Sequence, residues 1–453
     1  MDFKMSTKAL SILLLASLIL TVSDSTLLAQ SADKEASKFA IPTTDEGLPG
    51  AGPIRRYEWF QNLWQRKRSK WATQVQQDQN AVVFLGDSIT QDWGDTMGNS
   101  FGDMKVANRG ISGDTTRGML IRLKDDVLSL NPKAVVMLMG TNDLEEKAEP
   151  ETIAANVKLI ITALKKHNPD MPITLCKVFP SSADKFRPAD KITKINELCA
   201  AVVKGDPQIT VLDTWLLFAD ENGDAKLEEF PDLLHPNKLG YAKWAAALRP
   251  IFATQGFLDT KPEAFELEPG FTSLFNGKDL TGWGFRKTAP RKQPKKPRPN
   301  ALLFVEIKED IAFDGKTESN DHRFAAINGR LVVKTPVEGR RIQQLWTTAE
   351  FDGNFILKLE FRATPNADSG VFIRKPQLQC RDFILAGPYK DLKKYRPQDW
   401  NKLVVTVKDG IATATCNGEL LTDNMAVPAT GPIGLEGDRG QLEYRNIRLK
   451  KIE

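Results

Sequence analysis

Cysteine and histidine are scarce in this chain. Its 453 residues include four Cys and three His. No Cys stands in a CxxC pair or in a Cys/His cluster with zinc spacing, so the sequence predicts no metal site. The Cys fall two in each half of the chain, and the sequence leaves open whether either pair forms a disulfide or whether they stay free and buried. They are Cys176, Cys199, Cys380 and Cys416.

Long hydrophobic runs are also rare, and the clearest one covers residues 9–22. Lys4 and Lys8 precede it, and small residues follow near positions 29–32, a pattern that predicts a secretory signal peptide over residues 1–30. At about 14 residues the run is shorter than the roughly 20 that span a bilayer, with an uncleaved anchor as the alternative. No Cys lies near its end, which excludes a lipid anchor on an amino-terminal Cys. We expect a secreted or periplasmic protein with no stable membrane span after cleavage.

Neither sign of charge dominates. The chain has 62 Lys and Arg against 58 Asp and Glu, a formal charge of +4, and 41% hydrophobic residues. These values indicate a soluble globular protein of two or three domains and exclude a disordered chain. The positive excess comes from residues 286–300, which hold seven Lys and Arg and no acid. We therefore expect no nucleic-acid partner. The segment is interpreted as a solvated insertion loop, with binding to an anionic polymer as the alternative.

The region from about residue 55 to 255 alternates apolar runs with segments of helical period. The apolar runs cover 81–85, 134–139, 173–179 and 209–212, with a weaker one near 104–108; the helical segments cover 115–130, 151–167, 190–204 and 239–252. This alternation predicts an α/β domain with a parallel sheet covered on both faces. In such sheets ligands bind at the carboxyl ends of the strands, so we look there for chemistry.

The region from 270 to 453 has a different pattern: strands in which apolar and polar residues alternate are separated by turn dipeptides. It predicts an all-β sandwich domain, joined to the first domain by a linker at 256–269. The dipeptides supply the positive φ that tight hairpins need. They are Asn276-Gly277, Asn328-Gly329, Asp352-Gly353, Asp409-Gly410 and Asn417-Gly418.

A serine, a histidine and an aspartate stand in positions that suit a nucleophilic site. Ser88 follows the first predicted strand in the run FLGDSIT, where it is either a nucleophile or a helix N-cap. His235 lies just before the last helix in DLLHPN, and Asp232 precedes it by three residues. A serine nucleophile needs a base, and the base needs a carboxylate that fixes its tautomer.

Two further positions can supply hydrogen-bond donors for a developing oxyanion. Gly113, in NRGISGD, follows the second strand and offers a backbone N–H. Asn142, in GTND, follows the third strand and offers a side-chain amide. Taken singly, a Gly or an Asn at a strand end is more often part of a turn. Where such groups do bind an oxyanion, they usually make the largest electrostatic contribution to acyl transfer.

Together these blocks closely resemble the SGNH (GDSL-type) hydrolase family, and within it the platelet-activating-factor acetylhydrolases and small bacterial thioesterases. The resemblance covers about residues 81–252. It implies a flavodoxin-like α/β sandwich in which Ser88 attacks the acyl carbon, His235 is the general base and then acid, and Asp232 orients it. It also implies an oxyanion hole formed by the N–H groups of Ser88 and Gly113 and by the Asn142 amide, with no cofactor.

The neighbouring residues have plainer interpretations. We expect Asp87, Asn108 and Asp143 to tie the loops together by hydrogen bonds. Trp93 lines an acyl pocket or belongs to the core. The aromatic series at positions 57, 60, 64 and 71 fits one face of a helix and is interpreted as core packing rather than a sugar platform.

The second half resembles the 3-keto-disaccharide hydrolase family. The resemblance covers about residues 270–452 and rests on the runs GFTSLFNGKDLTGW from 270, SGVFIR from 369, WN at 400 and YRNIR from 444. It implies a concanavalin-like jelly roll with a glycoside-directed role, with Arg374, Gln379 and Asp382 as candidate site residues. The family commonly shows Glu-Val-Gln-Ile-x-Asp where this chain has QLQCRD at 377–382. Gln377 thus replaces an acid, and because a neutral amide is no general base, sugar binding stands beside catalysis as an alternative.

The sequence therefore predicts a secreted serine esterase that removes acyl groups, expected to be acetyl, from a carbohydrate or another small acyl ester. One alternative is a 3-keto-glycoside hydrolase that works through the second domain with an accessory esterase. The other is a non-catalytic carbohydrate-binding surface protein. The sequence leaves the oligomeric state open.

Overall fold

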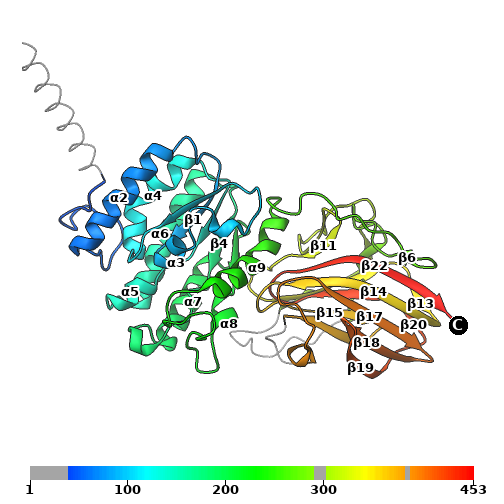
Figure 1. Cartoon of the computed structure of the whole chain (residues 1–453). Helices are drawn as coiled ribbons and strands as arrows, with labels where there is room; N and C mark the ends of the chain where they lie inside the picture. The colour runs from blue at the N-terminus through cyan, green and yellow to red at the C-terminus, as the bar shows by residue number, and fades with distance from the viewer. Residues whose placement is uncertain (1–38, 290–302, 383–387) are drawn as a thin grey trace, which may run out of the picture.

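The structure of the protein is a computed structural model, which describes residues 39–289, 303–382 and 388–453. It has two parts, an α/β part and a β part, which lie side by side (Figure 1). The predicted signal peptide lies outside the described residues, as does the basic segment from residue 290 onward. Among the residues described, no helix is long and apolar enough to cross a membrane.

The α/β part is built on a parallel sheet. Its strands are β1 (Val82–Gly86), β2 (Val106–Gly110), β3 (Ala134–Met137), β4 (Ile173–Cys176) and β5 (Ile209–Leu212), in the order β2-β1-β3-β4-β5. This is the flavodoxin-like strand order, in which β2 is added on one side of β1 and the later strands are added on the other side. The predicted parallel sheet is confirmed, and the end of β1, where Ser88 lies, is the topological switch point.

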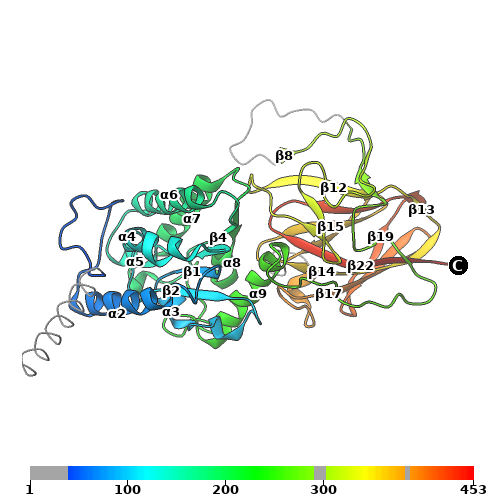
Figure 2. The same ribbon diagram turned by 90° about the horizontal axis from the view of Figure 1, so that it is seen from above.

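Helices cover both faces of this sheet (Figure 2). They are α2 (Glu58–Gln74), α3 (Ser88–Asp92), α4 (Thr116–Asp126), α5 (Thr141–Glu145), α6 (Pro150–His167), α7 (Ala189–Val203), α8 (Thr214–Phe218) and α9 (Lys238–Thr254). One face packs against apolar side chains of α4, α6 and α7, and the other against those of α3, α8 and α9. Two separate apolar layers therefore hold the sheet, which explains why its strands are apolar on both sides.

The β part consists of antiparallel sheets packed face to face, as the sequence predicted. Within the described residues one sheet has the order β10-β11-β22-β14-β17-β18-β19 with β6 beside β22, and the other β16-β15-β21-β12-β7-β9 with β8 beside β12. A single apolar core lies between them. In β14, alternate residues from Phe355 to Phe361 point into that core, as a strand with one buried face requires.

The strands of the β part are short except for a few in the centre. They are β6 (Thr272–Ser273), β7 (Trp283–Phe285), β8 (Leu303–Phe304), β9 (Ile311–Ala312), β10 (Phe324–Ile327), β11 (Arg330–Val333), β12 (Arg341–Thr347), β13 (Phe351–Asp352), β14 (Asn354–Ala363), β15 (Asp368–Ile373), β16 (Gln377–Arg381), β17 (Asn401–Lys408), β18 (Ile411–Cys416), β19 (Glu419–Ala426), β20 (Thr430–Gly431), β21 (Ile433–Gly437) and β22 (Leu442–Ile452).

Three of the five turn dipeptides form hairpins. Those at 328, 409 and 417 join the paired strands β10 and β11, β17 and β18, and β18 and β19, with both residues at positive φ. The prediction of hairpins at 276 and 352 was wrong. The strands that flank those turns pair with other strands, because the chain there crosses between sheets rather than folding back on itself.

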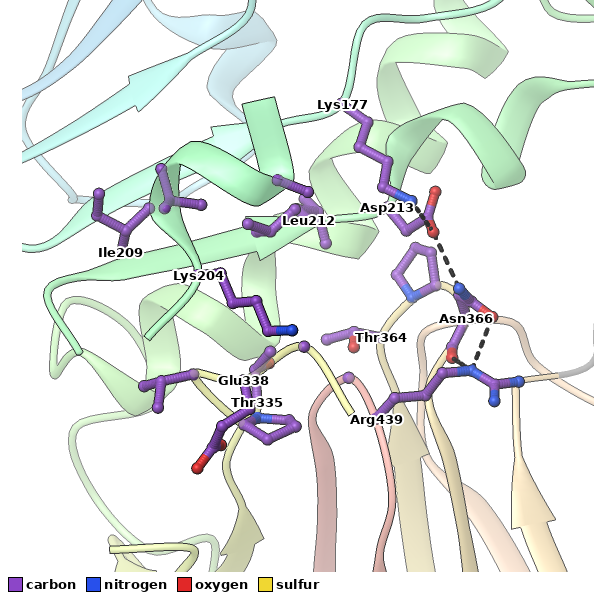
Figure 3. Close-up of a pocket in the computed structure, with 18 of the residues that line it drawn as sticks. Lys177, Lys204, Ile209, Leu212, Asp213, Thr335, Glu338, Thr364, Asn366 and Arg439 are labelled. Atoms are coloured by element: carbon purple, nitrogen blue, oxygen red, sulfur yellow. Dashed lines mark hydrogen bonds and ion pairs between the residues drawn. The ribbon is translucent and has the colours of Figure 1, made fainter. Parts of the chain in front are cut away.

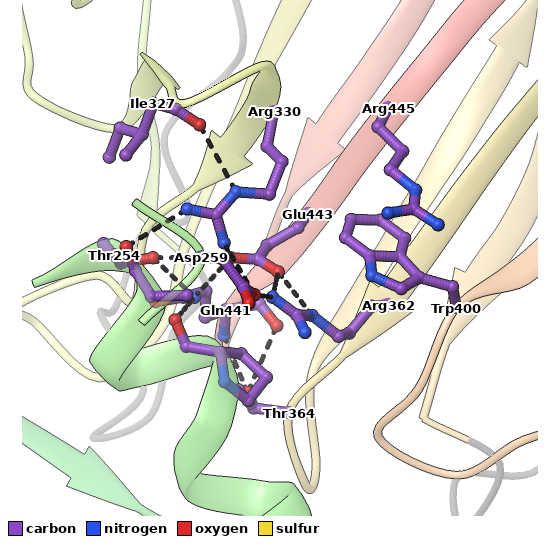
Figure 4. A network of polar contacts seen from close by, with 12 residues as sticks. Thr254, Asp259, Ile327, Arg330, Arg362, Thr364, Trp400, Gln441, Glu443 and Arg445 are labelled. Carbon is purple, nitrogen blue, oxygen red and sulfur yellow. Dashed lines mark hydrogen bonds and ion pairs between the residues drawn. The ribbon is translucent and has the colours of Figure 1, made fainter. Parts of the chain in front are cut away.

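The predicted linker at 256–269 lies against the β part and is held by ion pairs. Glu443 of β22 is fully buried between Arg330 and Arg362, whose guanidinium groups also approach Asp259 of the linker. Arg330 donates to the Ala253 carbonyl at the end of α9, which ties the two parts together (Figure 4). Gln441 makes a second tie by donating to the Pro250 carbonyl and the Thr254 hydroxyl (Figure 4).

A cavity of about 280 Å³ lies where the two parts meet (Figure 3). Lys177 and Asp213, which follow β4 and β5, form an ion pair at its rim, and Asn366 of the β part donates to the same Asp213 oxygen at 2.9 Å. The Gly205 N–H donates to the Val337 carbonyl nearby. Ser88, Asp232 and His235 do not line this cavity.

All four Cys are free and buried in the described structure. Burial raises the pKa of the Cys176 and Cys199 thiols to about 12, so both are protonated at neutral pH. The question left open by the sequence is thus answered by four free thiols that behave as small apolar side chains.

Candidate active site

Ser88 is the first residue of α3, directly beyond the carboxyl end of β1. The preceding residue, Asp87, caps this helix by accepting a hydrogen bond from the Ile89 N–H, so the capping role belongs to Asp87 and not to Ser88. Gly110, at the end of β2, packs against this turn: a β-carbon there would lie 2.3 Å from the Gln91 nitrogen. The close approach fixes the Ser88 hydroxyl at the switch point of the sheet.

His235 reaches Ser88 across 147 residues of sequence. Its Nε2 lies 2.9 Å from the Ser88 Oγ, and its Nδ1 lies 2.7 Å from an Asp232 carboxylate oxygen. The other Asp232 oxygen accepts the backbone N–H groups of Leu234 and His235, at 3.0 and 2.7 Å. Leu233, between them, takes a left-handed conformation with φ of 61°, which folds the short loop tightly enough for this contact. The structure thus brings the predicted serine, histidine and aspartate into one hydrogen-bonded chain.

The charge on Asp232 is stabilised locally. Partial burial raises the pKa of this carboxyl, but the backbone N–H of His235, its ring and the N–H of Leu234 outweigh that effect, and the pKa lies below its usual value. The side chains of His235 and Asp232 remain 34% and 47% exposed, whereas Ser88 is buried. The His235 ring can therefore accept the proton of the Ser88 hydroxyl, and solvent reaches this ring.

The two candidate oxyanion donors lie next to each other. Gly113 follows β2 with φ of 84°, in the left-handed region that favours glycine. The Asn142 amide, at the start of α5, donates to the Asp114 carbonyl at 3.0 Å and so contacts the loop that carries Gly113. One amide hydrogen of Asn142 is used in that bond, which leaves the other for a ligand.

Two arginines that the sequence analysis missed hold this corner in place. Arg187, which is buried, donates to the Asn142 side-chain oxygen at 3.2 Å and to Glu145 at 2.7 Å. Arg55 pairs with Glu145 and Glu146. Because Arg187 occupies the oxygen of Asn142, the amide nitrogen must face the Gly113 loop. Nothing in the local sequence marks these arginines, since their partners lie 42 to 91 positions away in the chain.

Three buried carboxyl groups surround the candidate oxyanion corner. Burial raises the pKa of Asp87 and Asp143 to about 6 and that of Asp114 to about 7, although Arg122 opposes the shift at Asp114 and hydrogen bonds from Thr116 oppose it at Asp143. The tying roles expected of Asp87, Asn108 and Asp143 are seen: for example, Asn108 donates to the Thr90 carbonyl at 2.8 Å.

Trp93 belongs to the core. It is 5% exposed and stacks on Trp244, with ring centroids 4.5 Å apart, and on Tyr241 at 5.3 Å. The Tyr241 hydroxyl donates to the Ile89 carbonyl, which ties α9 to the nucleophile turn. These rings pack against one another directly after α3.

The aromatic series on α2 divides into two groups. Phe60, Trp64 and Trp71 are buried, as predicted. For Tyr57 the prediction was wrong, because it is the N-cap residue of α2 with extended backbone, and its side chain is 53% exposed. The helical period does not apply to a residue outside the helix.

The candidates in the β part do not form one site. Arg374 donates to the carbonyl groups of Phe351, Gly353 and Pro428 and so clamps three backbone segments. Asp382 is buried and accepts from the Asn366 N–H and the Gln398 amide. The two lie at opposite ends of β15, whose six residues span about 20 Å.

A carboxyl group that the sequence analysis did not consider lies beside Gln377. The amide of Gln377 donates to Glu436 of β21, and Gln379 is on the same strand, two residues from Gln377. Burial, then the nearby carboxylates of Asp438 and Asp368, raises the pKa of Glu436 to about 7. A carboxyl therefore does stand at this face of the sheet, on a different strand from the one that the family pattern indicates.

No group of three or more potential metal-ligating side chains occurs in the part of the chain that the structure describes.

Replacing Asn142 with alanine tests the candidate oxyanion corner. If the amide holds the oxyanion of an acyl-transfer reaction, kcat for a short acyl ester falls by about 10²- to 10³-fold with little change in KM, because the donor acts on charge that develops in the transition state. Asn222→Ala, in an exposed loop, is the matched control. A fall in kcat of less than about threefold would contradict the role of Asn142 as an oxyanion donor.

Each part of the chain matches a known family. Residues 84–243 match the GDSL-like Lipase/Acylhydrolase family, and residues 270–450 match the 3-keto-alpha-glucoside-1,2-lyase-like domain. The human platelet-activating factor acetylhydrolase IB subunit alpha2 is 26% identical over 232 residues, which are 51% of this chain and 95% of that protein. The rat alpha1 subunit is 28% identical over 191 residues, 42% of this chain and 82% of its own length. A crystal structure of a GDSL-like lipase from Bacteroides thetaiotaomicron is 24% identical, covers 41% of this chain and 97% of its own, and has a TM-score of 0.37.

Proposed function

We propose that this chain, a carboxylic ester hydrolase with a GDSL-like acylhydrolase domain followed by a 3-keto-alpha-glucoside-1,2-lyase-like domain, releases short acyl groups from esterified carbohydrate outside the cytoplasm. The observation that carries the proposal is the hydrogen-bonded chain from Ser88 through His235 to Asp232, with contacts of 2.9 and 2.7 Å. Export is proposed from the signal-peptide pattern of residues 1–30.

In the proposed reaction the Ser88 oxygen attacks the acyl carbon while the His235 Nε2 takes its proton. Asp232 accepts the Nδ1–H and stabilises the imidazolium that forms. Gly113 and Asn142 donate to the oxyanion. His235 then returns the proton to the leaving alcohol, and a water molecule, activated by the same nitrogen, hydrolyses the acyl-enzyme to release the acid and free Ser88.

Two features support a short acyl group on a large alcohol. The core rings of Trp93, Tyr241 and Trp244 pack against one another directly after α3, which disfavours a long acyl chain there. His235 and Asp232 are partly open to solvent, which allows an ester on the surface of a bulky molecule to approach. The 3-keto-alpha-glucoside-1,2-lyase-like domain supports a carbohydrate as that molecule.

A panel of esters with the purified protein tests this function. Turnover of p-nitrophenyl esters should fall from acetate through butyrate to octanoate, and acetate should be released from an acetylated xylooligosaccharide. Faster hydrolysis of octanoate than of acetate would contradict the short acyl group. Turnover of acetate esters without any release from the acetylated sugar would contradict the carbohydrate.

Glu436 supports a second candidate function, an elimination on a 3-keto-α-glucoside by the β part. A ketone at C3 acidifies the hydrogen at C2, so a base can take that proton while the C1–O bond breaks and the alcohol leaves with a proton. A carboxyl with pKa near 7 is suited to this exchange near neutral pH.

Glu436→Gln is the corresponding test. If Glu436 is the base, cleavage of a 3-keto-α-glucoside by the full chain rises with pH through about 7, and the variant loses about 10²- to 10⁴-fold in kcat. Glu350→Gln, at an exposed carboxyl of the same part, is the control. Equal activity of wild type and Glu436→Gln would contradict the role of Glu436 as the base.

A further inference from the structure

Two large aromatic side chains at the start of α2 are half exposed. Tyr57 is 53% and Trp59 is 52% exposed, whereas the aromatic residues further along the helix are buried. Their rings are nearly parallel, 9° apart in plane, with centroids separated by 6.4 Å. Core packing explains the buried members of the series, but it does not explain two adjacent rings that remain in water.

The Trp59 ring lies against the candidate oxyanion corner. A β-carbon on Gly113 would lie 2.7 Å from the Trp59 Cη2. The next residue, Asp114, accepts the hydrogen bond from Asn142. The carbon whose oxygen occupies the oxyanion hole carries both the acyl group and the alkoxy oxygen, so both begin beside these donors. With the short acyl group proposed above, it is the alcohol that extends outward. A ring at Trp59 is therefore placed to contact what lies just beyond the ester.

The position of Trp59 is fixed by its packing. Its ring meets that of Phe60 edge to face, with centroids 5.7 Å apart, and Phe60 is 1% exposed. The Arg55 guanidinium also borders Gly113 and is held by Glu145 and Glu146. A surface that is already ordered loses little conformational entropy when it binds a ligand.

The chemistry of this surface favours a sugar ring. The face of an aromatic ring is electron-rich and attracts the weakly positive C–H groups on one side of a pyranose. The carboxylates of Glu145 and Glu146, which pair with the neighbouring Arg55, are 40% and 21% exposed and keep lone pairs that can accept hydrogen bonds from sugar hydroxyl groups. An alkyl chain, in contrast, gains most from an enclosed apolar groove, which two open rings beside carboxylates do not provide.

We propose that Tyr57 and Trp59 form a subsite that stacks against the sugar ring carrying the ester, next to Gly113. The proposal rests on the esterase function proposed above and names the part of the surface that selects the alcohol. It predicts that these rings act on sugar esters and leave ring-free esters unaffected.

Two substrates that differ only in the alcohol provide the test. Methyl acetate has no ring, and an acetylated xylooligosaccharide has several; acetate release from both is measured by titration of acid. Trp59→Ala should lower kcat/KM for the sugar ester by about 10-fold or more and change that for methyl acetate by less than about twofold. Trp59→Phe, which keeps a ring, should recover most of the loss. Phe265→Ala, at an exposed aromatic in the linker, is the matched control.

Other results separate the proposals. Equal losses on both substrates would mean that Trp59 only supports the Gly113 loop, and no loss on the sugar ester would mean that it does not touch the sugar; either overturns the subsite. If Trp59→Ala does not fold, Tyr57→Ala is held to the same two outcomes. If wild type hydrolyses neither ester, the esterase function itself fails, and that result is distinct from a failure of the subsite.

Discussion

Ser88→Ala is expected to lower kcat/KM for a short acyl ester by about 10⁴- to 10⁶-fold, since no acyl-enzyme can form without the hydroxyl. The residual rate comes from the oxyanion donors and from binding. The substitution removes one buried oxygen and leaves the Asp87 cap on Ile89 in place, so the fold should be kept. Acetate release measured together with thermal unfolding separates loss of chemistry from loss of structure.

Ser129→Ala is the matched control for this experiment. Ser129 is an exposed serine that donates to the Asp125 carbonyl, and its replacement should leave acetate release unchanged. If Ser88→Ala kept more than about a tenth of the wild-type activity, Ser88 would not be the nucleophile, whatever its distance from His235.

Asp232→Asn is expected to lower kcat by about 10³- to 10⁴-fold. The asparagine oxygen can still accept the backbone N–H groups of Leu234 and His235, so the loop keeps its shape. Its NH₂ group, however, faces the Nδ1 of His235 and favours the tautomer with the proton on Nε2. That tautomer points a hydrogen at Ser88 and cannot take the serine proton. Asp170→Asn, at an exposed position, is the control.

The same variant makes a prediction about stability and pH. The pKa of Asp232 is lowered in the folded protein, so its ionised form stabilises the fold at pH values above about 4, and this contribution is lost as the pH falls through the lowered pKa. The melting temperature of wild type should therefore exceed that of Asp232→Asn near neutral pH, and the two should converge as the pH falls through the lowered pKa of Asp232. A constant difference across that range would contradict the role of the carboxylate charge.

The weak strand predicted near 104–108 shows where a local pattern loses information. It is β2 (Val106–Gly110), which ends in polar residues that are buried all the same. Arg109 pairs with Asp78 and lies over the Trp71 ring at 5.0 Å. A hydrophobic pattern scores such a segment poorly because it cannot include the distant partners that satisfy the charge.

Arg374 shows that a local motif does not reveal the surroundings of a side chain. Its position after the Ser-Gly-Val-Phe run suggested a ligand-binding residue, but at φ of 66° its guanidinium turns to three carbonyl groups of neighbouring segments. Glu436, which carries the carboxyl that Gln377 lacks, lies about 60 positions further along the chain. The order of the strands in a sheet decides which of them supplies a side chain at a given place on its face. That order cannot be predicted from any single segment of the sequence.

The sequence by itself determined the alternation of strands and helices, the change to a β-sandwich after the linker, and the placement of Ser88, Gly113 and Asn142 each just beyond a strand. These follow from apolar periodicity and turn chemistry, which act over a few residues. Tertiary structure alone decided that the His235 ring meets Ser88, that Arg187 orients Asn142, and that Trp59 lies against Gly113. Those contacts join segments up to 147 residues apart, and their geometry is set by the register of the sheet and by the way the helices pack on it.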